Sequence, residues 1–102
     1  MSNTKELLPE LEIELDEPIE WNGKSVSSVV LREPKAREVQ QALAEIGNGN
    51  TPDTVYKYQI SLISKVSGHS RQIIEQLPIR KLAQGFRYLE AFLEPGPETG
   101  ES

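Results

Sequence analysis

The stretch LEIELDEPIEWNGKSVSSVVLREP, from Leu11 to Pro34, decides the fold of the first third of the chain. Two extended, apolar-rich segments flank Asn22-Gly23, a pair suited to a type I′ turn because both central positions of that turn need a positive φ. We therefore predict an antiparallel β-hairpin over residues 11–32. The following Arg32-Glu33-Pro34 ends the second strand and leads directly into a helix.

The first strand is predicted to bury one of its two faces. Apolar residues alternate with acidic ones from Leu11 to Leu15, and Ile19 and Trp21 keep the same parity. A period of two is typical of a strand with one face in the core. Pro18 interrupts this run, and because it lacks an N–H we expect it at an edge or at a local break in the ladder.

The returning strand needs an irregularity to bury its apolar residues. Val26 lies on the apolar face, but Val29 and Leu31 have the opposite parity. A β-bulge near Ser27-Ser28 would restore both to the buried side. Val30 would then be left as an apolar residue on the outer face of the sheet.

Helical periodicity dominates the rest of the chain, and helices are predicted at about 35–46, 52–67, 71–76 and 79–93. Gly47 and Gly68 are typical helix ends, and Thr51-Pro52 is a typical helix start. The fold class is thus α+β: an N-terminal antiparallel β-hairpin followed by three to four α-helices packed on one face.

The predicted helices carry apolar stripes expected to form the core. In the first helix the stripe is Ala36, Val39, Leu43 and Ile46. In the second it includes the following residues: Val55, Tyr56, Ile60, Leu62, Ile63 and Val66. The last helix is expected to bury the following residues: Ile79, Leu82, Phe86, Leu89 and Leu93.

Two tyrosines, Tyr58 and Tyr88, fall off these stripes. Exposed tyrosines favour protein interfaces. Together with Val30 they are the predicted partner-binding residues of the chain.

The 102 residues fit one domain, predicted over residues 10–93. We expect residues 1–9 to be a flexible N-terminus and residues 94–102, EPGPETGES, to be a disordered tail without apolar residues. The net charge of −5 is uneven, because the first 20 residues hold seven acidic residues and one lysine. Such charges either solvate exposed faces and protect a strand edge from self-pairing, or they orient a partner electrostatically.

Composition argues against several classes of protein. The chain has no cysteine and a single histidine, His69, without neighbouring ligands, so we expect no catalytic residues, no metal site and no cofactor. No apolar run approaches the roughly 20 residues that span a membrane, and the first residues lack the basic and apolar regions typical of a signal peptide, so no membrane association is expected. The sequence pI of about 4.9 disfavours nucleic-acid binding.

Short motifs along residues 11–93 resemble the small tail assembly chaperones of Mu-like and related contractile-tailed phages. The matching segments of this sequence are Asp16-Glu17-Pro18-Ile19, Asn22-Gly23-Lys24, Leu31-Arg32-Glu33-Pro34, Ile63 to Gly68, Leu77 to Arg80, and Phe92-Leu93. The chain departs from the commoner pattern in Trp21 before the turn and in its acidic first strand, which puts the specificity for a partner in doubt.

The resemblance implies a non-enzymatic role in viral morphogenesis. Such chaperones bind the long helical tape measure protein, keep it soluble in the host bacterial cytoplasm, and leave before the tail is complete. The implied partners are the tape measure protein, other tail proteins and further copies of this chain. The alternative is a small structural subunit of the tail or baseplate that is retained in the virion of the phage or prophage. Many such proteins also have a longer product made by ribosomal frameshifting.

Overall fold

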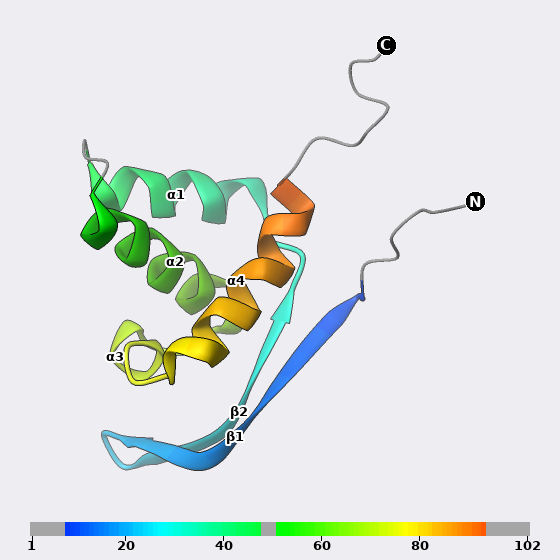
Figure 1. The fold of residues 1–102 in the computed structure, drawn as a ribbon, viewed down its shortest axis with the longest axis vertical. Helices are drawn as coiled ribbons and strands as arrows, with labels where there is room; N and C mark the ends of the chain where they lie inside the picture. Colours follow the sequence, from blue (N-terminus) through cyan, green and yellow to red (C-terminus); the bar gives the residue numbers. More distant parts are fainter. Residues whose placement is uncertain (1–7, 48–50, 94–102) are drawn as a thin grey trace.

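A computed structural model of the chain describes residues 8–47 and 51–93. Its elements, in chain order, are β1 (Glu10–Trp21), β2 (Lys24–Arg32), α1 (Ala36–Ile46), α2 (Pro52–Ser67), α3 (Arg71–Ile74) and α4 (Ile79–Leu93) (Figure 1). The predicted α+β class is confirmed. The third helix is shorter than the predicted 71–76, because a turn replaces its last residues. Apart from residues 8 and 9, the expected flexible N-terminus and disordered tail lie outside the described residues.

The hairpin turns where the sequence predicts. Trp21 pairs with Lys24 across the turn, and the two residues between them, Asn22 and Gly23, have φ values of 54° and 81°. Two consecutive positive φ values are the mark of a type I′ turn. Residues 20–25 around this turn are all exposed. Trp21, expected on the buried face, is therefore at the uncovered end of the hairpin.

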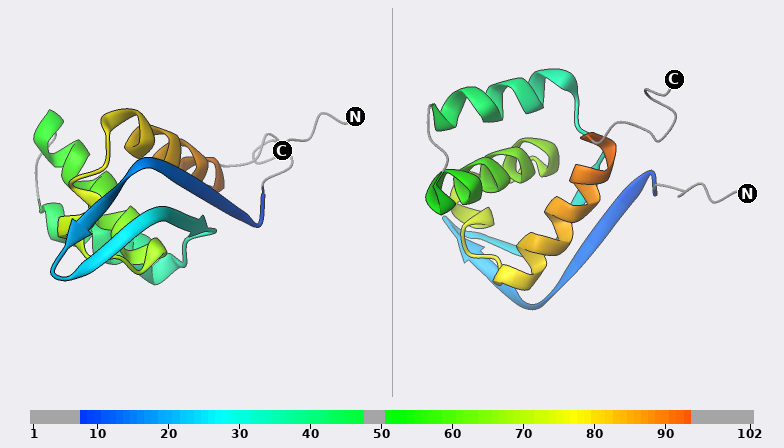
Figure 2. Two further views of the ribbon diagram at one scale, coloured as in Figure 1. Left: turned by 90° about the horizontal axis from the view of Figure 1, so that it is seen from below. Right: turned by 45° about the horizontal axis from the view of Figure 1, so that its top comes forward.

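The irregularity in the ladder lies in β1 and not at Ser27-Ser28 as predicted. Ile19 pairs with Val26, whereas the next regular pair joins Glu14 to Ser28. Four residues of β1, 15–18, therefore lie opposite the single Ser27. The extra residues are placed in β1 because Pro18 has no N–H to donate to the ladder. Figure 2 shows that β1 bends part-way along its length.

The irregularity has the predicted effect on the side chains of β2. Val29 and Leu31 are fully buried under the helices, whereas Val30 lies on the outer face and is 39% exposed. The helices α2, α3 and α4 cover the inner face of the hairpin, and α1 packs against α2 (Figures 1 and 2). The largest fully buried side chains are Ile13, Val29, Leu31, Leu62, Ile63, Ile74 and Leu89.

Gly85 sets how closely α4 approaches the hairpin, a feature that the stripe pattern does not predict. A Cβ atom at this position would lie 3.0 Å from Cδ1 of Leu31 and 3.1 Å from Cδ1 of Ile13. Both neighbours belong to the buried core, so there is no open space for an extra methyl group. The absence of a side chain at Gly85 therefore allows the helix to rest directly on the sheet.

An ion pair fixes the junction between β2 and α1. Arg32 donates two hydrogen bonds to the carboxylate of Glu38, with Nη1···Oε1 at 3.0 Å and Nη2···Oε2 at 2.7 Å. The same carboxylate accepts the backbone N–H of Lys35 at 2.8 Å and so satisfies the first turn of α1. The hydrogen bonds from Arg32 hold the pKa of Glu38 below its usual value. The Leu31-Arg32-Glu33-Pro34 segment thus has a structural role in starting α1.

Candidate functional site: an apolar groove between the helices

The apolar face of α2 is covered over only half of its length. Leu62 and Ile63 are fully buried. Val55 and Tyr56, each seven residues earlier and therefore on the same sides of the helix, are 46% and 47% exposed. The hairpin and α4 enclose the second half of α2, whereas the first half touches α4 through Tyr58 and Phe86 and leaves Val55 and Tyr56 open. The expectation that Val55 and Tyr56 belong to the core is therefore wrong.

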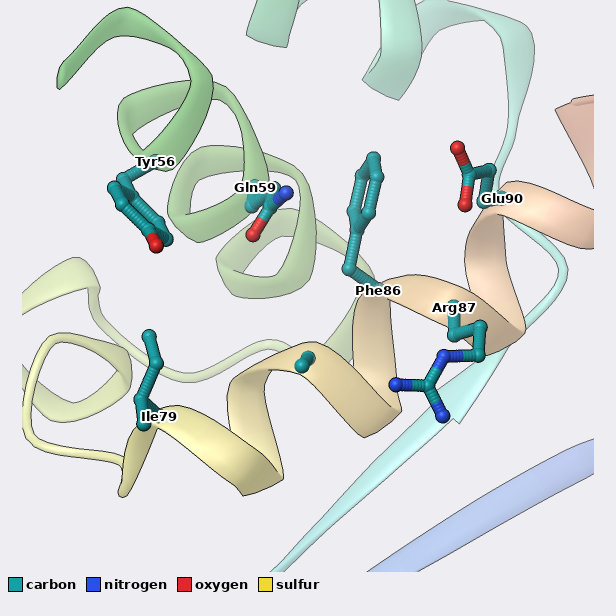
Figure 3. A pocket seen from close by; sticks show the side chains of 7 residues that line it. Tyr56, Gln59, Ile79, Phe86, Arg87 and Glu90 are labelled. Carbon is teal, nitrogen blue, oxygen red and sulfur yellow. The ribbon is translucent and has the colours of Figure 1, made fainter. Parts of the chain in front are cut away.

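The first turns of α4 form the opposite wall of a hollow along this uncovered half. Ile79, the first residue of α4, is 59% exposed, although it was expected on the buried stripe. In Figure 3, Tyr56 and Gln59 of α2 lie across the hollow from Ile79 and Phe86 of α4. The hollow has a volume of about 220 Å³, and its lining is Tyr56, Gln59, Ile79, Ala83, Phe86, Arg87 and Glu90.

A second hollow of about 170 Å³ continues the first toward α1. Its lining is Leu43, Ile46, Thr54, Val55, Tyr58, Gln59 and Phe86. Gln59 and Phe86 border both hollows, so the two form one surface. We call this surface the α2–α4 groove and define it by the residues that line the two hollows.

Contacts between α1 and α2 explain why Leu43 lines the groove, although it was expected in the core. Glu45 accepts hydrogen bonds from Ser61 Oγ at 2.6 Å and from Lys65 Nζ at 2.7 Å. These bonds lower the pKa of Glu45, that from Lys65 most of all, and they hold one side of α1 against α2. With α1 in this rotation, the small side chain of Ala42 is the buried residue and Leu43 is exposed.

Phe86 is the central aromatic residue of the groove. It is half-buried and not fully buried as predicted. Its ring packs edge-to-face on Tyr58, with ring centroids 5.7 Å apart and an interplanar angle of 79°. Burial of Tyr58 raises the pKa of its hydroxyl. Although Tyr58 was expected off the core stripe, it packs against the core and also lines the groove.

The other two predicted partner-binding residues lie elsewhere. Val30 is on the outer face of the hairpin. Tyr88 is half-buried, packs edge-to-face on Phe92, and donates a hydrogen bond from its hydroxyl to the backbone carbonyl of Leu8 at 2.5 Å. The structure therefore places only Tyr58 at the groove. Sequence reasoning missed the main lining residues Val55, Tyr56 and Ile79, because their periodicity is that of a buried stripe.

No further chemistry is evident in the part of the chain that the structure describes. Within residues 8–47 and 51–93, no three His, Cys, Asp or Glu side chains lie close enough together to hold a metal ion. None of the described helices has the length and apolar character needed to cross a membrane. A hollow of about 460 Å³ at the break in β1 is lined partly by acidic side chains, including Asp16, Glu17 and Glu20.

An apolar groove between helices is one of the geometries by which proteins bind an apolar helix of a partner. The comparison with known families agrees with a class of binding proteins. The family described as "Phage tail assembly chaperone proteins, E, or 41 or 14" matches residues 12–94, which is most of the chain. The chain belongs to this family of phage tail assembly chaperones. No curated protein and no solved structure gives a significant match.

Proposed function

We propose that this tail assembly chaperone binds the tape measure protein of its phage in the host cytoplasm, through the α2–α4 groove. The observation that carries the proposal is the half-covered apolar face of α2. Val55 and Tyr56 continue a stripe whose other members are core residues, and nothing within the described chain covers them. A helix of a client with an apolar face would complete this layer, as in other helix-in-groove complexes.

The proposed role requires binding and release without catalysis. The exposed apolar side chains of the groove would shield matching side chains of the client from water and from one another. Each Å² of apolar surface buried in this way contributes about 25 cal/mol before the costs of association. We expect a groove of two small hollows to give a modest affinity, which would suit a chaperone that leaves its client before the tail is complete.

Co-expression with the tape measure protein tests the proposed surface. We expect the Tyr56→Ser, Ile79→Ser double variant to yield much less soluble complex than the wild type. The matched variant is Val30→Lys, which changes an exposed candidate residue on the outer face of the hairpin, and we expect it to lose less. If only the second variant loses the complex, the client binds at the hairpin side and the groove assignment is wrong.

Mass spectrometry of purified phage particles tests the proposed release. A chaperone that leaves the tail should be absent from the particles, whereas a structural subunit should be present in a fixed ratio to the other tail proteins. Detection at such a ratio contradicts the proposal and supports the alternative of a subunit retained in the tail or baseplate.

A further inference from the structure

We propose that a second copy of this chain covers the α2–α4 groove when no client is bound, in a symmetric dimer. The groove has the features of a self-complementary surface, whereas the two free edges of the hairpin do not. The dimer itself is independent of the proposed function. Only its competition with the tape measure protein rests on that function.

The free strand edges of the hairpin repel their own copies. The sheet has only two strands, so each has one free edge. Strand β1 contains no Lys or Arg. Its acidic residues are Glu10, Glu12, Glu14, Asp16, Glu17 and Glu20. Like charges opposite one another destabilise a strand pair. An antiparallel pair of β2 strands would likewise bring Lys24 of each copy near Arg32 of the other. Pairing of the free edge of β1 in one copy with the free edge of β2 in another is a head-to-tail contact, which does not close into a dimer.

The border of the groove has charges of both signs. Arg87 and Glu90 lie three residues apart on α4, and both line the first hollow (Figure 3). Neither takes part in any ion pair of the described residues. In a symmetric contact each surface meets a copy of itself, so a border with both signs can place opposite charges together.

The shape of the groove is also self-complementary. The exposed side chain of Ile79 stands beside the hollow that it helps to line, so the same surface offers both an apolar projection and an apolar recess. Two copies related by a two-fold axis can therefore each insert a projection into the recess of the other. Burial of such a central apolar contact provides most of the energy of a protein interface.

The chain's own remaining segments provide too little apolar surface to cover the groove. Residues 94–102 contain no apolar side chain apart from Pro95 and Pro97, and residues 1–7 contain only Met1 and Leu7. Covering Val55, Tyr56, Leu43 and Ile79 from within one chain would require more large apolar residues than these. A second copy provides a matching set.

Sedimentation velocity of the full-length chain at increasing concentration tests the dimer. We expect the wild type to dimerise reversibly. Arg87→Glu makes the charged border wholly acidic and Glu90→Arg makes it wholly basic, so each should weaken dimerisation by about tenfold or more. An equal mixture of these two variants should recover dimers, because an acidic border then meets a basic one. Val30→Glu on the outer face is the matched control and should dimerise like the wild type.

Each of the opposite results overturns the proposal. A wild type that stays monomeric at all concentrations shows that no second copy covers the groove. A mixture of the two charge variants that stays monomeric excludes a symmetric contact across this border, provided that circular dichroism shows both variants folded. Loss of dimers in Val30→Glu places the contact on the hairpin. Added tape measure protein should convert the dimers to a complex of this chain with the tape measure protein. If the dimers form but this conversion fails, the proposed function is contradicted and the proposal of a dimer still stands.

Discussion

The two halves of α2 have the same apolar period and opposite environments. Leu62 and Ile63 lie in the core, whereas Val55 and Tyr56, at equivalent positions two turns earlier, face solvent. The difference comes from their neighbours: the hairpin and α4 enclose the second half of the helix, whereas the first half meets α4 at Tyr58 and Phe86 and leaves Val55 and Tyr56 open. A stripe therefore identifies the side of a helix that prefers burial but does not identify what covers it. The uncovered half is the surface that we propose for the partner.

Truncating one residue in each half should show the largest contrast in stability. Leu62→Ala removes a fully buried side chain and should lower the free energy of unfolding by about 2–5 kcal/mol. Val55→Ala, on the same side of the same helix, should change it by less than about 0.5 kcal/mol. Urea denaturation of the isolated chain at low concentration measures both. Equal losses in the two variants would mean that the first half of α2 is covered as well.

The second half of α2 is enclosed because α4 packs against the hairpin. Within this contact, Gly85 is where α4 lies close against the side chains of the hairpin. Gly85→Val would place methyl groups against Leu31 and Ile13 in a packed core, so we expect a loss of about 1–3 kcal/mol. Gln84→Val adds the same side chain at the neighbouring exposed position and is the control. A Gly85→Val variant as stable as this control would show that α4 can move away from the sheet at little cost.

Local signals predicted most of the fold. Asn22-Gly23 fixed the turn because few residue pairs adopt two positive φ values, and the helix ends followed from glycine, proline and threonine. The strand carrying the bulge was predicted wrongly, since parity shows that a register shift is needed but not which strand holds the extra residues. Pro18 was the available signal, because a residue without an N–H marks where the ladder breaks.

The candidate site was predicted less well because it depends on how helices pack. Tyr56 and Tyr58 exchanged their expected roles: Tyr58 packs against the core and Tyr56 is exposed. Helical periodicity alone could not show where α4 ends its contact with α2. The rotation of α1 also depends on the long-range bonds of Glu45, which no local pattern reveals. Family resemblance predicted the class of protein but not the surface that it uses.

A smaller effect is expected where α1 joins the hairpin, and it should depend on pH. Glu38→Gln removes the ion pair with Arg32 and should cost about 1 kcal/mol at neutral pH, because Arg32 remains partly open to solvent. The pKa of Glu38 is lower in the folded chain than the unfolded value of about 4.3. Its contribution is therefore present above that value and is lost as the pH falls through the folded pKa. Urea denaturation at several acidic pH values should show that the free energy of unfolding falls less steeply with decreasing pH in the variant than in the wild type. Parallel curves of this free energy against pH would contradict the role of Glu38.

The smallest effect on stability should come from the groove itself. Tyr56→Ser and Ile79→Ser each remove a side chain that is about half exposed, so the free energy of unfolding of the monomer should change by less than about 0.5–1 kcal/mol. The same changes should reduce self-association and client binding, because the groove loses its two most prominent apolar side chains. Denaturation at low concentration together with sedimentation at high concentration separates the two effects. A large loss of monomer stability would instead assign Tyr56 and Ile79 to the core, and the uncovered half of α2 would no longer be a candidate binding surface.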